Sequence, residues 1–283
     1  MPNHLPLSAL KYVVALLAAV LLTACGGGGA TGFPPVVTAF KAQSVLYSRS
    51  AVIYIGGNDL RSNMTVDTGG ACTNPSFSSS SSTSLLVLNC TVVKVGDMAL
   101  TLKDGNGNVV YQTTVTVPKP QVTLATSSGN VTLELDPAAA PITVTNFLNY
   151  VHSGYYTSTL FHRVIAGFMI QGGGYTTGLV KKAGQTAPIT LESNNGLSNL
   201  RGTIAMARTN DPNSATSEFF INVVNNTFLD YKSAASPGYA VFGTVLQGLD
   251  VVDAINAQAT GSVNGFADVP LTDVTITSAT QIK

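Results

Sequence analysis

The feature that most constrains this chain is the run at residues 161–174, FHRVIAGFMIQGGG, in which one cation and one amide stand among apolar side chains. A short apolar run of this kind is typical of a buried strand, and the glycines at 172–174 let the backbone turn or lie close to another segment. Arg163 only donates hydrogen bonds and cannot lose its proton. We therefore expect a hydrogen-bond donor held in an apolar pocket, suited to a ligand with a carbonyl oxygen and an apolar ring.

A lone arginine more often covers a strand with its stem and keeps its charged head in water. Here further motifs follow in a fixed order, namely GTIAMAR at 202–208, SEFFIN at 217–222, FLD at 228–230 and YAVFG at 239–243. Together with the first run they resemble the cyclophilin family of peptidyl-prolyl isomerases, and most of all its bacterial periplasmic branch. The resemblance covers about residues 121–283. It implies an eight-stranded antiparallel β-barrel capped by two helices.

The resemblance also implies how the site works. Rotation about an X-Pro bond is slow, with a barrier of about 18–20 kcal/mol, because resonance gives the C–N bond double-bond character. Arg163 would donate a hydrogen bond to the imide nitrogen in the twisted state and so stabilise it. The resemblance implies that the proline is surrounded by Phe168, Met169, Phe220 and Leu229. The peptide main chain would be bound by Gln171 and by the backbone near Ala207 and Arg208. Two further binding positions differ from many eukaryotic members, with Phe228 in place of tryptophan and Tyr239 in place of histidine.

Glu218 departs from the family pattern, which usually has glutamine there. An ionised carboxylate only accepts hydrogen bonds, whereas an amide also donates. We expect Glu218 to pair with Arg163, to occupy the donor before substrate arrives, and to lower activity, so that Glu218→Gln raises kcat/KM a few fold. The alternative is that the carboxylate orients the guanidinium usefully.

Other functions are less well supported. The alternative to catalysis is a proline-peptide-binding or chaperone lipoprotein without isomerase activity. A serine hydrolase would need a Gly-x-Ser-x-Gly elbow, which the sequence lacks, and the glycines at 172–174 lack the Lys-Ser/Thr of a phosphate loop. Acidic and basic residues number 14 each, so no net charge attracts nucleic acid. We expect a monomer that binds proline-containing unfolded or flexible polypeptides, with no cofactor and no metal.

The N-terminus has the build of a lipoprotein signal peptide at residues 1–24. Lys11 precedes an apolar run, Val13 to Leu22, that is short for a membrane span, and LTAC at 22–25 resembles a bacterial lipobox. Cys25 would then be lipidated, and the Gly-rich residues 25–32 would form a tether. A signal peptide cleaved before Cys25 without lipidation is the alternative. We expect a cell-envelope protein that faces the periplasm and is held at the membrane by a lipid anchor.

Residues 33–117 predict a small β-sandwich that resembles an immunoglobulin-like module, acting as a spacer or adhesion module. Short β-type runs are predicted at 51–55, 64–67, 84–89, 98–103 and 109–117, with the hairpin signal DGNGN at 104–108. After export, Cys72 and Cys90 are expected to form a disulfide. Zinc is the competing use of cysteine, but no second ligand pair completes a tetrahedral site.

The linker Pro118-Lys119-Pro120 precedes the isomerase-like domain at 121–283. In that domain a hairpin is expected from 122–125 and 130–135. Helices are expected from Pro141 to Gly154, and from about Leu249 to Ala257.

Overall fold

The computed structural model describes residues 33–283. The predicted signal peptide 1–24, the lipidation site Cys25 and the tether 25–32 lie outside the described residues. Within the part of the chain that is described, no helix is both long and apolar enough to cross a membrane.

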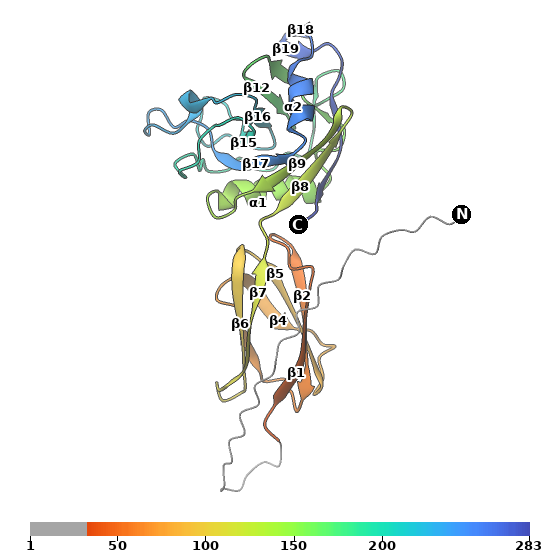
Figure 1. The fold of residues 1–283 in the computed structure, drawn as a ribbon, viewed down its shortest axis with the longest axis vertical. Helices are drawn as coiled ribbons and strands as arrows, with labels where there is room; N and C mark the ends of the chain where they lie inside the picture. The colour runs from red at the N-terminus through yellow and green to blue at the C-terminus, as the bar shows by residue number, and fades with distance from the viewer. Residues whose placement is uncertain (1–32) are drawn as a thin grey trace, which may run out of the picture. The chain divides into compact units, whose positions relative to one another are not determined.

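Residues 33–117 form two antiparallel sheets that enclose one core (Figure 1). The strands are β1 (Val36–Gln43), β2 (Ser50–Asn58), β3 (Thr65–Asp67), β4 (Cys72–Phe77), β5 (Leu85–Val92), β6 (Gly96–Lys103) and β7 (Val109–Val117). The orders are β1-β2-β5-β4 and β3-β6-β7. Alternate residues of β2, β5 and β6 are buried, as in Ile53, Leu88 and Leu100, so one face of each sheet fills the core.

The two-sheet arrangement agrees with the predicted sandwich, whereas its immunoglobulin-like character stays a prediction. Two of the strands, β1 and β4, were not among the predicted runs. Pro75 lies inside β4, and proline removes a ladder hydrogen bond, which argues against a central strand. The structure places β4 at the edge of its sheet, where a proline is tolerated.

The predicted disulfide is present and joins Cys72 in β4 to Cys90 in β5, with 5.6 Å between their Cα atoms. Both cysteines are buried in the sandwich core. The bond ties the edge strand to its neighbour and closes the ring that contains the serine-rich residues 78–84.

Residues 121–283 form a curled sheet with two α-helices, as predicted (Figure 1). The main strands are β8 (Gln121–Thr126), β9 (Gly129–Leu135), β10 (Thr159–Leu160), β11 (Arg163–Ile165), β12 (Met169–Gly172), β15 (Thr203–Met206), β16 (Phe219–Asn222), β17 (Val241–Gln247) and β20 (Thr275–Gln281); two small hairpins are β13 (Tyr175–Thr176) with β14 (Val180–Lys181) and β18 (Thr260–Val263) with β19 (Phe266–Pro270). The helices are α1 (Pro141–His152) and α2 (Leu249–Asn256), and η1 (Thr227–Leu229) is a 3-10 turn.

The sheet curls into a barrel because its two edge strands are nearly continuous in sequence. Its order is β10-β20-β8-β9-β17-β15-β16-β12-β11, and all pairs are antiparallel. Only Phe161 and His162 separate β10 at one edge from β11 at the other. If these two segments are counted as one interrupted strand, the nine strands become eight, which is the number that the family resemblance implied.

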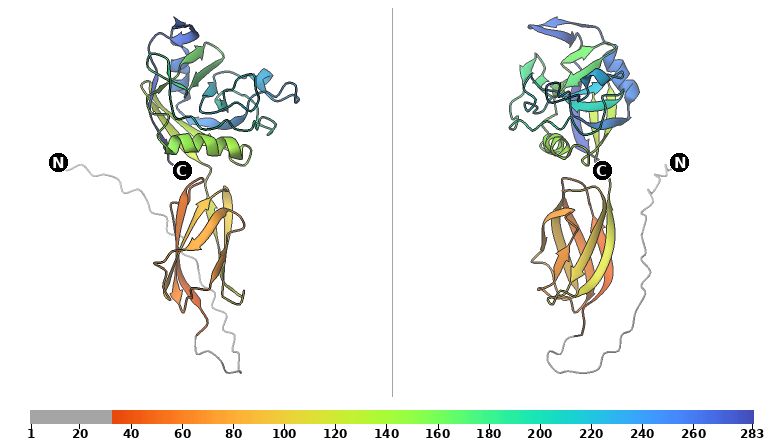
Figure 2. Two further views of the ribbon diagram at one scale, coloured as in Figure 1. Left: turned by 180° about the vertical axis from the view of Figure 1, so that it is seen from behind. Right: turned by 90° about the vertical axis from the view of Figure 1, so that its left-hand side faces the viewer.

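The two helices cover different sides of the curled sheet (Figure 2). Phe147 and Leu148 of α1 and Val252 and Ile255 of α2 all enter the same core. The free N–H groups at the start of α1 are bonded by a distant side chain, because Glu192 accepts from the backbone of residues 142 and 143 at 3.1 and 2.8 Å.

The run at 161–174 differs from the single buried strand that was predicted. It forms a hairpin of β11 and β12, in which Gly167 turns the chain with φ +68°. Asn256 at the end of α2 holds this turn, because its side chain donates to the Ile165 carbonyl and accepts from the Gly167 N–H. The segment is therefore an edge hairpin, and Arg163 at its start is partly exposed.

We expect the disulfide to contribute about 3 kcal/mol to the stability of residues 33–117, because it closes a loop with a sequence separation of 18. A Cys72→Ala/Cys90→Ala variant should show a lower midpoint of urea denaturation for the sandwich. Both cysteines should resist thiol labelling in the native protein until a reductant is added. Free labelling of both without reductant would contradict the disulfide.

Candidate functional site

Strand register assembles the site as a row across five neighbouring strands. Arg163 pairs with Gln171, Gln171 with Phe220, Phe220 with Ala205, and Ala205 with Val241. Because side chains alternate between the faces of a strand, all five lie on the face opposite the main core. Met169, Ala205, Phe220 and Val241 form a small apolar cluster of their own on that face.

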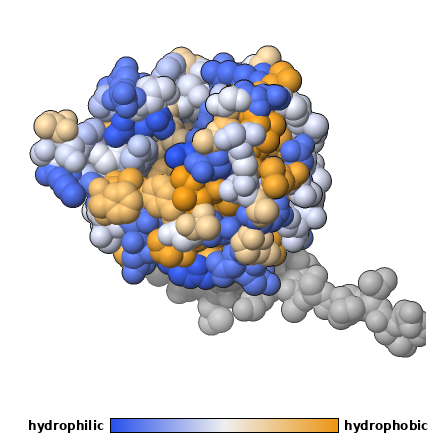
Figure 3. Space-filling model, turned by 90° about the horizontal axis from the view of Figure 1, so that it is seen from above, coloured by the Kyte–Doolittle hydropathy of each residue, from blue (hydrophilic) through white to orange (hydrophobic). Residues whose placement is uncertain are grey.

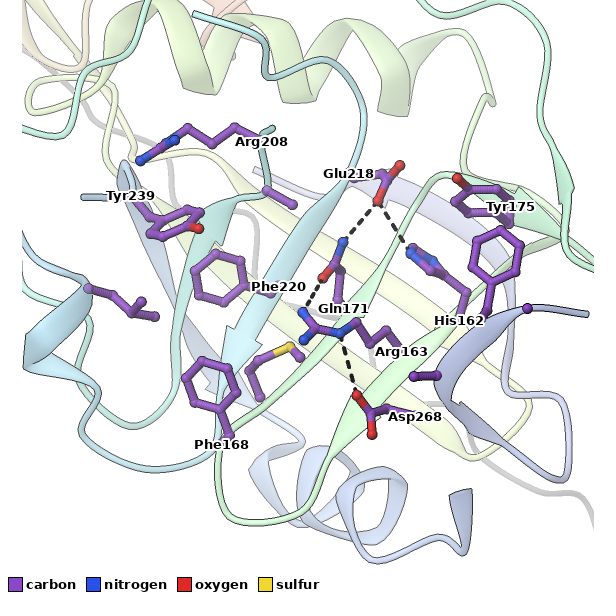
Figure 4. A pocket seen from close by; sticks show the side chains of 16 residues that line it. His162, Arg163, Phe168, Gln171, Tyr175, Arg208, Glu218, Phe220, Tyr239 and Asp268 are labelled. Atoms are coloured by element: carbon purple, nitrogen blue, oxygen red, sulfur yellow. Dashed lines mark hydrogen bonds and ion pairs between the residues drawn. The ribbon is translucent and has the colours of Figure 1, made fainter. Parts of the chain in front are cut away.

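A pocket of about 660 Å³ opens over this row (Figure 4). Its lining residues are His162, Arg163, Phe168, Met169, Gln171, Tyr175, Ala207, Arg208, Glu218, Phe220, Leu229, Tyr239 and residues 265–268. Figure 3 shows apolar side chains exposed in the middle of one face of the molecule, with polar side chains around them.

The structure brings together ten of the eleven residues that the sequence placed in the catalytic and binding set. Phe228 is the exception, since it lies outside the pocket lining and is 62% exposed. Its ring stacks on Phe168, with 5.8 Å between the ring centroids, so it buttresses the pocket wall from outside.

Three parts of the lining were missed by sequence reasoning. They are His162, Tyr175 and the tip of the β18–β19 hairpin at 265–268. The Asn264-Gly265 pair is a strong turn signal that would have predicted the hairpin itself. Nothing in the local sequence says that this hairpin lies beside β11.

Arg163 is held on two sides by weak contacts. Its Nη1 donates to Gln171 Oε1 at 3.5 Å, and its Nε lies 3.7 Å from Asp268 Oδ2 (Figure 4). The side chain is 43% exposed, so it lies at the rim and is not enclosed in the apolar pocket. Most of its N–H groups remain available to a ligand, because each of the two contacts is long for a hydrogen bond.

Glu218 binds Gln171 and His162. Its Oε2 accepts from Gln171 Nε2 at 2.9 Å and from His162 Nε2 at 3.3 Å. Gln171 is therefore oriented with its nitrogen toward Glu218 and its oxygen toward Arg163. The expected direct pair of Glu218 with Arg163 is wrong, because Asp268 is the carboxylate that contacts Arg163.

The carboxyl group of Glu218 stays ionised at neutral pH. Burial acts to raise its pKa, but hydrogen bonding and charge from His162, hydrogen bonding from Gln171 and the charge of Lys181 outweigh burial. The net pKa is below the ordinary value of 4.5. Gly174 leaves room for this carboxyl, since a Cβ at residue 174 would lie 2.6 Å from the Glu218 side chain.

The other end of the pocket contains Arg208 and Tyr239. The Arg208 guanidinium lies 4.6 Å from the centre of the Tyr239 ring and donates to the Gly238 and Thr209 carbonyls. The Ala207 N–H already donates to the Glu218 carbonyl at 2.9 Å. The backbone near Ala207 was predicted to bind the peptide, but its N–H group is already hydrogen-bonded within the protein.

A buried network of asparagines, also missed from the sequence, fixes the apolar end of the pocket. Asn226 donates to the Phe168 carbonyl at 2.9 Å and to Asn222, which in turn donates to Asn199. Asn199 donates to Asp230, which follows Leu229. The network therefore anchors the two segments that carry the Phe168 and Leu229 side chains.

The site thus joins an apolar pocket to a partly exposed guanidinium. Among residues 33–283, no cluster of three or more His, Cys, Asp or Glu side chains could hold a metal ion. Fold and site together define a β-barrel protein whose pocket sets an apolar cluster beside a partly exposed hydrogen-bond donor.

Comparison with known proteins then gives the family. The family model for cyclophilin type peptidyl-prolyl cis-trans isomerases matches residues 121–281. A peptidyl-prolyl cis-trans isomerase of Streptomyces antibioticus is 56% identical over 160 residues, which are 56% of this chain and 96% of that protein. Peptidyl-prolyl cis-trans isomerase B of Escherichia coli is 52% identical over 161 residues, which are 56% of this chain and 98% of that protein. The chain belongs to the family of cyclophilin-type peptidyl-prolyl cis-trans isomerases, which confirms the resemblance seen in the sequence.

Two solved structures are also similar to this chain. A cyclophilin type isomerase of Cryptosporidium parvum is 24% identical, with a TM-score of 0.49, and the match covers 59% of this chain and 99% of that one. A cyclophilin from Hirschia baltica is 26% identical, with a TM-score of 0.46 and coverage of 57% and 73%.

The contacts of Glu218 change the expected effect of its substitution. In Glu218→Gln the new amide oxygen can still accept from Gln171 and His162, so kcat/KM should stay within about twofold of wild type. In Glu218→Leu the Gln171 amide loses its partner, and kcat/KM should fall about tenfold. Assay of a proline-containing peptide measures both.

Glu134→Gln is the matched control, because Glu134 accepts from Gln121 away from the pocket. A several-fold rise for Glu218→Gln would contradict this account and restore the original idea that the carboxylate competes for Arg163.

Proposed function

We propose that this protein catalyses cis-trans isomerisation of X-Pro bonds in exported polypeptides, with Arg163 as the catalytic hydrogen-bond donor. The observation that carries the proposal is the strand register, which pairs Arg163 with Gln171 and Gln171 with Phe220, so that the guanidinium and the apolar cluster line one pocket. A proline ring in the apolar cluster would bring its imide bond within reach of the guanidinium.

The chemistry needs no covalent intermediate. As the X-Pro bond twists, resonance is lost and the lone pair localises on the imide nitrogen, which becomes a hydrogen-bond acceptor. Arg163 donates to it, and this interaction exists only in the twisted state. Stabilising that state by ~7 kcal/mol would accelerate rotation by about five decades. The apolar pocket holds the ring while the carbonyl side turns.

The Gln171 oxygen supports this role. It faces Arg163 because Glu218 holds the amide nitrogen on the other side. One nitrogen of the guanidinium, Nη1, therefore has a fixed acceptor in the Gln171 oxygen, and the other donors stay available on the pocket side. Phe168, Leu229 and Tyr239 complete the wall around the ring.

We further propose that the protein is anchored in the cell envelope and faces the periplasm, as a monomer that acts on unfolded or flexible clients. Support comes from the LTAC sequence at 22–25 after an apolar run, and from the disulfide between Cys72 and Cys90. Disulfides persist in oxidising compartments such as the periplasm.

Replacement of the proposed donor tests the mechanism. We expect Arg163→Ala to lower kcat/KM by about a hundredfold, or ~2.7 kcal/mol, while the circular dichroism spectrum stays that of the wild type. Arg163→Lys keeps the charge but loses the planar fork of donors. Its kcat/KM should lie between those of the wild type and Arg163→Ala.

Near-wild-type turnover by Arg163→Ala would refute the mechanism. A wild-type protein that binds proline peptides without accelerating their isomerisation would instead favour the non-catalytic chaperone.

Lipidation predicts a second result. Cys25→Ser should release the protein from membranes or block its maturation, whereas mass spectrometry of the wild type should find an acylated N-terminal Cys25. An unmodified Cys25 in a soluble mature chain would refute the anchor.

A further inference from the structure

The β18–β19 hairpin forms the wall of the pocket next to Arg163. β19 packs against β11, the edge strand that begins with Arg163. Asn264 and Gly265 make the turn, with φ of 50° and 84°, and Phe266 packs edge-on against Tyr175 with 5.1 Å between ring centroids. The Tyr175 ring in turn packs against the His162 ring, with 4.7 Å between the ring centroids. The hairpin is therefore tied to the pocket by side chains as well as by its backbone.

The hairpin carries a β-bulge that contains Asp268, the residue in contact with Arg163. Gly261 pairs with Val269 and Val263 pairs with Phe266, so two residues of β19, Ala267 and Asp268, face one residue of β18. Asp268 has φ +59°, in the left-handed region that L-residues with a side chain rarely adopt. Bulges re-aim side chains next to active sites, and here the bulge accompanies a carboxylate that points at Arg163 (Figure 4).

Contacts then run in a closed circuit around the pocket. Arg163 contacts Gln171, which contacts Glu218, which contacts His162. From His162 the circuit continues through Tyr175 and Phe266 to the hairpin and returns from Asp268 to Arg163. Gln171 and Asp268 thus hold the guanidinium from two sides.

We infer that Asp268 is a positioning residue, which holds the Arg163 guanidinium in place through the bulge of the β18–β19 hairpin. This inference rests on the proposed role of Arg163 as the hydrogen-bond donor. The carboxylate contacts Nε, the nitrogen nearest the stem, and so leaves the outer N–H groups of the fork to the substrate. Both side chains are about two-fifths exposed, so the pair is modest in strength and sensitive to salt.

The test compares two aspartates close in sequence. Asp268→Asn removes the charge, and asparagine tolerates a positive φ, so the bulge is kept. Asp273→Asn makes the same change at an exposed residue that does not line the pocket. We expect Asp268→Asn to lower kcat by about two- to fivefold with KM within about twofold, and Asp273→Asn to match wild type.

Two further readouts separate positioning from a general structural role. The ratio of wild-type to Asp268→Asn activity should approach one at about 1 M salt, where the Debye length is about 3 Å. The NMR signal of the Arg163 Nε–H, assigned by its loss in Arg163→Lys, should shift in Asp268→Asn and stay in place in Asp273→Asn.

Each outcome decides the matter. Wild-type kcat and an unmoved Nε–H signal in Asp268→Asn would overturn the inference, even if Arg163→Ala confirms the proposed mechanism. Equal losses in both aspartate variants would also overturn it. Retained activity in Arg163→Ala would refute the proposed mechanism, while the NMR shift alone would still establish that Asp268 holds Arg163.

Discussion

The structure of the site depends on the register of the strands that meet under the pocket. In β12, Ile170 enters the main core, while Met169 and Gln171 face the pocket. In β16, Phe219 and Ile221 enter the core and Phe220 faces the pocket. A slip of one residue would exchange these sets and bury Gln171 among aromatic rings. The packing of the core therefore fixes the positions of the functional side chains.

The short segment between β10 and β11 links that core to the site. Phe161 is buried and meets Phe219 edge-on, with 6.0 Å between ring centroids, whereas Arg163 two residues later lies at the rim of the pocket. Since the same segment closes the curled sheet, movement of Arg163 away from the pocket would disturb the closure. For this reason the apolar run at residues 161–174 was informative about both the fold and the site.

The sequence predicted those parts of the structure that depend on local pattern. The hairpin of β8 and β9, both α-helices and the cysteine pair follow from periodicity, turn residues and spacing. The partner of Glu218 could not be predicted, because a motif places a side chain near a pocket without saying which neighbour it faces. Asp268 was missed for a related reason. It comes near Arg163 only through the packing of one hairpin against an edge strand, which no local pattern encodes.

The distances around the three arginines of residues 121–283 separate two side chains whose donors are occupied within the protein from Arg163, the proposed catalytic donor. Arg201 donates to both oxygens of Asp253 at 2.9 and 2.7 Å, and also to the Val223 carbonyl. Arg208 donates to two backbone carbonyls at 2.8 to 3.0 Å. Such close contacts use up the fork of donors. Arg163 has contacts of 3.5 and 3.7 Å, which orient the group and compensate its charge without occupying its donors. A guanidinium that must bind a transient lone pair needs this arrangement, because any donor already in a short hydrogen bond would first have to be released.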